Sequence, residues 1–196
     1  MLKIGVLSLQ GAVTEHMKQI KKLGASPIEI KHAEQLNEID GLILPGGEST
    51  TVRKLMDRYG FMEPIRKFAD SEKPIFGTCA GMVLLAKNLS DSEEGHLSLI
   101  DITVKRNAFG RQKESFETML SLKGIKESVP AVFIRAPLVE HASDEVEILA
   151  EYEGQIVAAK QGNILVTSFH PELTEDYKLL SFFLDMIKEK ELFKVK

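Results

Sequence analysis

The sequence predicts an α/β protein with three layers, in which a mostly parallel central sheet is flanked by helices and the C-terminal half adds mixed or antiparallel strands. In the first half, near-continuous apolar runs alternate with segments of helical periodicity, as in parallel strands buried on both faces. After Ala86, short apolar runs follow one another through turns. The length of 196 residues and the apolar content of 43% suit one domain over residues 1–196.

The first half alternates strands with helices. Short apolar runs predict strands at residues 2–9, 27–30, 41–44 and 74–77. Helical periodicity predicts helices at residues 13–23, 50–59 and 62–69, and a helix-like run at 82–86. Gly24 ends the first of these helices, because glycine readily follows a helix C-terminus.

The second half is richer in strands. Apolar runs predict them at residues 100–104, 131–135, 147–152, 156–160 and 164–168. The pattern of residues 177–189 predicts an amphipathic helix, whose apolar side chains at core-like spacing are Leu179, Leu180, Phe183, Leu184 and Ile187.

The only cysteine, Cys79, stands where the apolar run at 74–76 gives way to a helix-like run, between Gly77 and Gly81. A sharp strand-to-helix turn displays a nucleophile, and small neighbours let a substrate approach. The start of a helix also lowers a thiol pKa and presents N–H groups to an oxyanion. The alternative is a buried cysteine that packs as a small apolar side chain.

His170 and Glu172 follow the apolar run at 164–167 and could serve such a nucleophile. Histidine transfers protons near neutral pH, and a carboxylate on its other nitrogen fixes the tautomer. Pro171 prevents a continued helix, so the segment is expected to be extended, with both side chains on one side. The alternative is a surface His-Pro turn with a solvated glutamate.

A third segment runs from residue 42 to 51 and contains Pro45-Gly46-Gly47-Glu48 after a predicted strand. Adjacent glycines allow backbone N–H groups to point at a ligand, although Pro-Gly-Gly is also a common turn. The segment is not a phosphate-binding loop, because the Gly-Lys-Ser/Thr ending is absent. All three segments follow strand ends, where open α/β sheets bind ligands.

These strings together resemble the class I (triad-type) glutamine amidotransferases, which have a flavodoxin-like fold, and within them the glutaminase subunits of pyridoxal 5′-phosphate synthase. The similarity runs along the whole chain. Val83 stands where other class I glutaminases typically have Gln, which separates the chain from the histidine-biosynthesis and anthranilate-type relatives. The strings that carry the resemblance are 9–12 with Glu15-His16, 45–51, 77–81, 106–112 with 115–117, 133–137 and 170–173.

The resemblance implies hydrolysis of L-glutamine to glutamate and ammonia by a triad of Cys79, His170 and Glu172. Backbone N–H groups of Gly47 and Ala80 would hold the oxyanion. Substrate contacts are implied for Gly47, Glu48, Ser49, Arg106, Ile134 and Arg135, and the role of each arginine stays open. Guanidinium and N–H donors suit an α-carboxylate.

The same resemblance implies a partner, a synthase subunit that makes pyridoxal 5′-phosphate and receives the ammonia in a hetero-oligomeric complex. No cofactor is expected on this chain, because the vitamer forms on the other subunit. A Glu-His pair early in a helix is usually an exposed face. The resemblance favours an interface instead, with Gln10, Gly11, Glu15 and His16 as the expected docking residues.

Composition excludes several other classes. The net charge is −4, from 29 acidic and 25 basic residues without a basic stripe, so no nucleic-acid partner is expected. No apolar stretch approaches the roughly 20 residues that cross a bilayer, and no signal peptide is recognisable. One cysteine cannot form an intrachain disulfide, which suits the cytoplasm. The remaining histidines, at positions 32, 96 and 141, lack metal-ligand spacing, so no metal is expected.

Two other interpretations stay open. One is a stand-alone cysteine hydrolase or stress protein of the related α/β type, which also places a cysteine on a strand-to-helix turn. The other is a catalytically silent regulatory subunit, which would bind glutamine without releasing ammonia.

Overall fold

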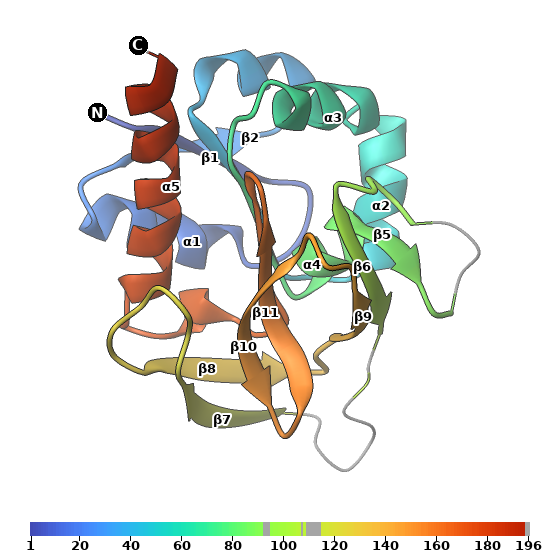
Figure 1. Cartoon of the computed structure of the whole chain (residues 1–196). Coiled ribbons are helices and arrows are strands. Elements are labelled where there is room, and N and C mark those ends of the chain that lie inside the picture. Colours follow the sequence, from blue (N-terminus) through green and yellow to red (C-terminus); the bar gives the residue numbers. More distant parts are fainter. Residues whose placement is uncertain (92–94, 107, 109–114, 195–196) are drawn as a thin grey trace.

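The computed structural model describes residues 1–91, 95–106, 108 and 115–194, and ten strands of this part form one twisted sheet (Figure 1). Five neighbouring strands are parallel, and all but the one at the edge of the sheet are largely buried. In the order β2–β1–β3–β4–β12 they span Ser26–Ile30, Lys3–Leu7, Gly41–Leu44, Ile75–Thr78 and Ile164–Thr167.

The sheet continues beyond β12 with antiparallel pairs, as the sequence predicts. The next strands are β11 (Gln155–Gln161), β9 (Leu138–Ala142), β6 (Ile100–Lys105) and β5 (Ala86–Leu89). β5 pairs with β6 in parallel, and β10 (Glu147–Tyr152) pairs with β11 in antiparallel. A separate hairpin joins β7 (Ser115–Leu120) to β8 (Val129–Ile134).

Helices cover both faces of the parallel strands, which confirms the three-layer prediction (Figure 1). One core lies beneath α2 (Ser49–Arg58), α3 (Met62–Asp70) and α4 (Ala80–Leu85). The other lies beneath α1 (Val13–Lys22), α5 (Lys178–Lys194) and the β7–β8 hairpin. Two short 3₁₀ helices, η1 (Ala33–Glu38) and η2 (Pro171–Leu173), complete the described elements.

The alternation of side chains along each strand explains why there are two cores. In β3, Leu42 and Leu44 enter the first core and Ile43 enters the second. In β4, Ile75 likewise enters the first core and Phe76 enters the second. Because successive strand side chains point to opposite faces, a strand between two helical layers must be apolar throughout.

Three strands were absent from the sequence prediction: β5, β7 and β9. β5 follows α4 directly, without a turn residue between Leu85 and Ala86. β7 and β9 have mostly exposed or half-buried side chains, so they lack a continuous apolar run. None of the helices in the described part of the chain combines the length and the apolar character needed to cross a membrane.

Candidate active site

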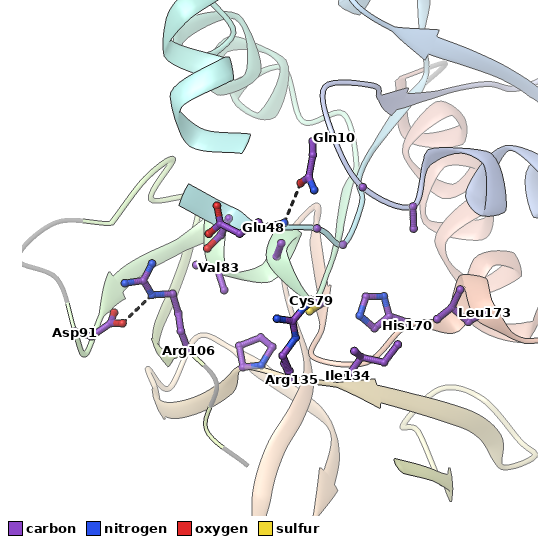
Figure 2. Close-up of a pocket in the computed structure, with 17 residues that line it drawn as sticks. Gln10, Glu48, Cys79, Val83, Asp91, Arg106, Ile134, Arg135, His170 and Leu173 are labelled. Carbon is purple, nitrogen blue, oxygen red and sulfur yellow. Dashed lines mark hydrogen bonds and ion pairs between the residues drawn. The ribbon is translucent and has the colours of Figure 1, made fainter. Parts of the chain in front are cut away.

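The three predicted segments meet at the carboxyl ends of the parallel strands, around a cavity of about 660 Å³ (Figure 2). β1 leads to Gln10 and Gly11, β3 to Gly46 and Gly47, and β4 to Cys79. These strands run parallel, so their ends share one edge of the sheet. β12 runs parallel beside β4 and brings His170 to the same cavity.

Cys79 sits at a sharp turn between β4 and α4, as predicted. Its backbone has φ 50° and ψ −103°, a conformation that ordinary L-residues avoid. The Cys79 N–H donates to the carbonyl of Thr167 at 2.8 Å, which fixes the turn to β12. A Cβ added at Gly81 would stand 2.1 Å from the carbonyl oxygen of Leu44, so glycine lets α4 start against β3. The side chain of Cys79 is only 8% exposed.

His170 connects Cys79 to Glu172. Its Nδ1 lies 2.7 Å from Oε1 of Glu172, and it also shares a hydrogen bond with Cys79. The prediction of an extended segment was wrong, because residues 171–173 form the 3₁₀ turn η2. Proline is favoured at the first position of a helical turn, where its missing N–H costs no hydrogen bond. The turn brings the carboxylate of Glu172 back onto the imidazole.

The two hydrogen bonds outweigh the effect of burial on His170. Burial lowers its pKa, whereas the hydrogen bonds to Cys79 and Glu172 raise it, to about 10 overall. Burial raises the pKa of Glu172, but the nearby His16 and the hydrogen bond with His170 hold it below its usual value. The arrangement therefore favours an imidazolium between two groups that can carry negative charge.

His16 lies inside the protein rather than on an exposed face. Its side chain is 1% exposed, and its Nε2 lies 3.3 Å from Oγ1 of Thr78 and 3.7 Å from Oε2 of Glu172. The expectation that His16 docks a partner is therefore wrong for this side chain. Its neighbour Glu15 is half-buried and does not line the cavity.

The glycine loop after β3 touches both His170 and the loop after β1. A Cβ at Gly46 would stand 2.4 Å from Cε1 of His170 and 3.5 Å from Cβ of Cys79. The carbonyl of Gly46 accepts a hydrogen bond from the N–H of Ala12 at 3.0 Å. Gly11 has φ 108°, and a Cβ there would overlap that same carbonyl. Glycine is required at both positions for this close approach.

The backbone N–H and the carboxylate of Glu48 both form hydrogen bonds within the protein. Its carboxylate caps α2 by accepting from the N–H groups of Thr50 and Thr51 at 3.0 and 2.7 Å. The hydrogen bond from the Thr51 side chain is the main reason why its pKa is lowered, to about 2. The Glu48 N–H donates to Oε1 of Gln10 at 2.9 Å (Figure 2). Ser49 also lines the cavity and is buried.

Two arginines reach the cavity from different elements (Figure 2). Arg106 is held by Asp91 at 2.7 Å and by Oγ1 of Thr50 at 3.2 Å. Arg135 follows Ile134 at the end of β8 and has φ 43°. The motif around Arg106 continues into residues 107 and 109–112, which lie outside the described part of the chain.

Sequence reasoning missed Asp91 and several apolar lining residues. The polar string Ser90-Asp91 after β5 was the available signal, but β5 itself was not predicted. It also missed Gln19, which is 4% exposed and donates to two backbone carbonyls of the η2 segment. The apolar lining residues that were not predicted as contacts are Ala12, Val83, Pro137 and Leu173.

Comparisons with known proteins agree with this geometry. Residues 6–189 match the model of the SNO glutamine amidotransferase family. The chain is 59% identical over 195 residues to the pyridoxal 5′-phosphate synthase subunit PdxT of Bacillus cytotoxicus, with 100% of both chains covered. It is 59% identical over 189 residues to the subunit of the same name from a Geobacillus species, covering 96% of this chain and 98% of the relative.

Solved structures show the same fold. A crystal structure of a glutamine amidotransferase superposes with a TM-score of 0.90 at 43% identity, covering 94% of this chain and 98% of the other. A chain in the structure of PurLQS from Thermotoga maritima superposes with a TM-score of 0.66 at 16% identity, over 100% of both chains. The second likeness concerns the fold alone.

Proposed function

The chain belongs to the SNO glutamine amidotransferase family, and we propose that it hydrolyses L-glutamine to L-glutamate and ammonia as the glutaminase subunit of a pyridoxal 5′-phosphate synthase. The observation that carries the proposal is the series Cys79, His170 and Glu172, joined by hydrogen bonds beside the cavity. The relatives named as pyridoxal 5′-phosphate synthase subunits, which cover 96% or more of the chain, support the same function.

In the proposed reaction, the thiolate of Cys79 attacks the side-chain amide carbon of glutamine. His170 donates a proton to the departing ammonia, which leaves a glutamyl thioester on Cys79. A water molecule then attacks the thioester, and His170 takes up its proton. Glutamate leaves and the thiolate returns, while Glu172 orients the imidazole and stabilises its charge throughout.

We assign the oxyanion hole to the backbone N–H groups of Gly47 and Ala80. Ala80 is the first residue of α4, and the early N–H groups of a helix have no partner within it. Removing one oxyanion donor typically costs about 10²–10³ in rate. The Gly46 carbonyl accepts from Ala12, so in a trans peptide the Gly47 N–H points the opposite way.

The remaining lining residues suit an amino-acid substrate. We propose that Arg106 and Arg135 attract the α-carboxylate of glutamine, and that the backbone around Gly47, Ser49 and Ile134 completes the contact. Glu48 contributes through its backbone, because its carboxylate already caps α2.

The ammonia must reach a partner unprotonated, because ammonium is not nucleophilic. We propose that it passes directly to a synthase subunit that docks near Gln10, Gly11 and Glu15 in a hetero-oligomer. The contacts of Gln10 with Glu48 and of Gly11 with Gly46 support a link between docking and the glycine loop that contributes the Gly47 N–H to the oxyanion hole. A nucleophilic thiol must also stay reduced, so a cytoplasmic location remains part of the proposal.

The test is the rate of glutamate release from L-glutamine by the purified chain, alone and with a pyridoxal 5′-phosphate synthase subunit. We expect release that the partner stimulates and that Cys79→Ala abolishes. Folded protein that releases no glutamate in either condition, beside an active synthase, would refute the proposal. Gln10→Ala should weaken complex formation or partner stimulation, and the docking proposal fails if both stay unchanged.

A further inference from the structure

One face of α1 packs against the turn that contains His170, Pro171 and Glu172. His16 and Gln19 are three residues apart, so they lie on the same side of the helix. Their side chains are 1% and 4% exposed. Two buried polar side chains on one helix face require partners, because an unpaired polar group in a protein interior is costly.

Gln19 fixes the backbone of the turn. Its Nε2 donates to the carbonyl oxygens of Pro171 and Thr174, both at 2.9 Å. The amide nitrogen of a glutamine has two hydrogens, and both are used here. Glu172 lies between these two anchored carbonyls, so its backbone position depends on α1.

His16 faces the carboxylate oxygen that His170 leaves free. Oε1 of Glu172 contacts Nδ1 of His170 at 2.7 Å. Oε2 is buried and has no hydrogen-bond partner in the part of the chain that the structure describes. Nε2 of His16 is 3.7 Å from Oε2, too long for a normal hydrogen bond but close enough for a strong charge–dipole contact.

The same nitrogen also fixes the residue before the nucleophile. Nε2 of His16 lies 3.3 Å from Oγ1 of Thr78, which is fully buried and immediately precedes Cys79. If Nε2 carried a lone pair, that lone pair would face a carboxylate. A proton on Nε2 instead points positive charge at Oε2 and at the hydroxyl oxygen.

The surroundings favour a neutral His16. Burial lowers its pKa, and so does the neighbouring His170, against the opposing effects of Glu172 and Glu15. Two imidazolium ions against one carboxylate would repel each other. Of the two imidazoles, the charged one is therefore His170, whose two hydrogen bonds favour its charged form.

We propose that His16 is a positioning residue of the glutaminase triad: a neutral imidazole, protonated on Nε2, that keeps Glu172 ionised and aimed at His170 while Gln19 holds the turn. This inference rests on the proposed function, because it assigns His16 a role through Glu172.

The first test needs no variant. In protein labelled with ¹⁵N-histidine, long-range ¹H–¹⁵N correlation spectra distinguish the two neutral tautomers and the imidazolium. We expect His16 to be neutral near pH 7 and to carry its proton on Nε2. A proton on Nδ1, or an imidazolium at that pH, would overturn the proposal.

The second test compares two substitutions that fill similar space. His16→Gln keeps an N–H donor near the position of Nε2, whereas His16→Leu removes it. We expect the titration midpoint of His170, followed by NMR, to fall by about one pH unit or more in His16→Leu, a tenfold change in proton affinity. In His16→Gln it should stay near the wild-type value. Equal midpoints in folded His16→Leu and wild-type protein would overturn the proposal.

The complex with the synthase subunit supplies a functional readout and a control. We expect kcat/KM for glutamine to fall about tenfold or more in His16→Leu, because a misplaced catalytic group can cost up to about 10² in rate, and to recover in His16→Gln. Lys18→Ala, an exposed change on the same helix, should alter neither quantity. A wild-type complex that releases no glutamate contradicts the proposed function, whereas the tautomer and the midpoint test His16 independently.

Discussion

Cys79 shows how single residues create the site. Its positive φ is a conformation that costs about 1–3 kcal/mol, so the surrounding structure must hold it. The hydrogen bond from Cys79 N–H to Thr167 and the approach of Gly81 to Leu44 provide that support. The strain therefore displays the sulfur to the cavity and to His170 (Figure 2).

Gly46 should be essential for activity and much less so for stability. In Gly46→Ala, the new Cβ would stand 2.4 Å from Cε1 of His170, so the imidazole must move. A displacement of about 1 Å in an active site can cost about 10² in rate, and we expect a loss of that order in kcat/KM. The measurement is glutamate release by the complex, together with thermal unfolding. Gly60→Ala, which adds a Cβ in open space, is the control; equal activities in both variants would contradict the account.

The stability of the protein should depend on the charge of His170 above neutral pH. The folded-state pKa is raised from 6.5 to about 10, so the stabilisation is complete below pH 6.5 and is lost as the pH rises towards 10. Wild-type protein should then lose up to about 1.4 kcal/mol of unfolding free energy per pH unit relative to His170→Gln. Urea unfolding at several pH values in this interval measures the difference. Parallel pH dependences of the two proteins would contradict the raised pKa.

The sequence predicted the residues of the site better than their local geometry. A lone cysteine between glycines and a His-Pro-Glu string are local signals, and Cys79 and His170 both line the cavity. The burial of His16 depends on the packing of α1 against η2, across more than 150 residues of chain, which no local pattern encodes. The extended form expected for residues 170–172 failed for a similar reason, since Gln19 anchors a 3₁₀ turn there.

At the scale of elements, the parallel strands were predicted from their apolar runs, and all of them except the edge strand β2 are largely buried. β3 was predicted with the bounds observed, and the others of this group differ by one or two residues. β7 and β9 were missed, because their side chains alternate or face solvent and pairing with neighbours defines them instead. A strand whose stability comes from its partner leaves a weak pattern in the sequence.

The contact between α4 and β3 should be important for folding. In Gly81→Ala, the added Cβ would stand 2.1 Å from the Leu44 carbonyl oxygen, a backbone atom that cannot rotate away. We expect a loss of about 1–3 kcal/mol in unfolding free energy, as for overpacked cores. The test compares the urea unfolding of this variant with that of Gly60→Ala. In Gly60→Ala the loss of unfolding free energy should come from backbone strain alone. A Gly81→Ala protein as stable as wild type would show that α4 can shift freely.

At the scale of the whole molecule, one continuous sheet connects the proposed docking loop to the proposed catalytic triad. β1, β3, β4 and β12 are neighbours, and their ends bring Gly11, Gly46, Cys79 and His170 to one cavity. Because the two cores share the same strands, we propose that residues 1–196 form a single domain. Docking at Gln10 and Gly11 would then affect the position of Gly46 without requiring a hinge motion.

We propose that the Cys79 thiolate attacks glutamine in each turnover. The most direct measurement is to quench the complex with acid during turnover of isotope-labelled glutamine and to locate the covalent adduct by mass spectrometry. We predict a glutamyl thioester on Cys79, the only cysteine of the chain, and its absence in Cys79→Ala. Glutamate release by Cys79→Ala at the wild-type rate, or an adduct on another residue, would contradict it.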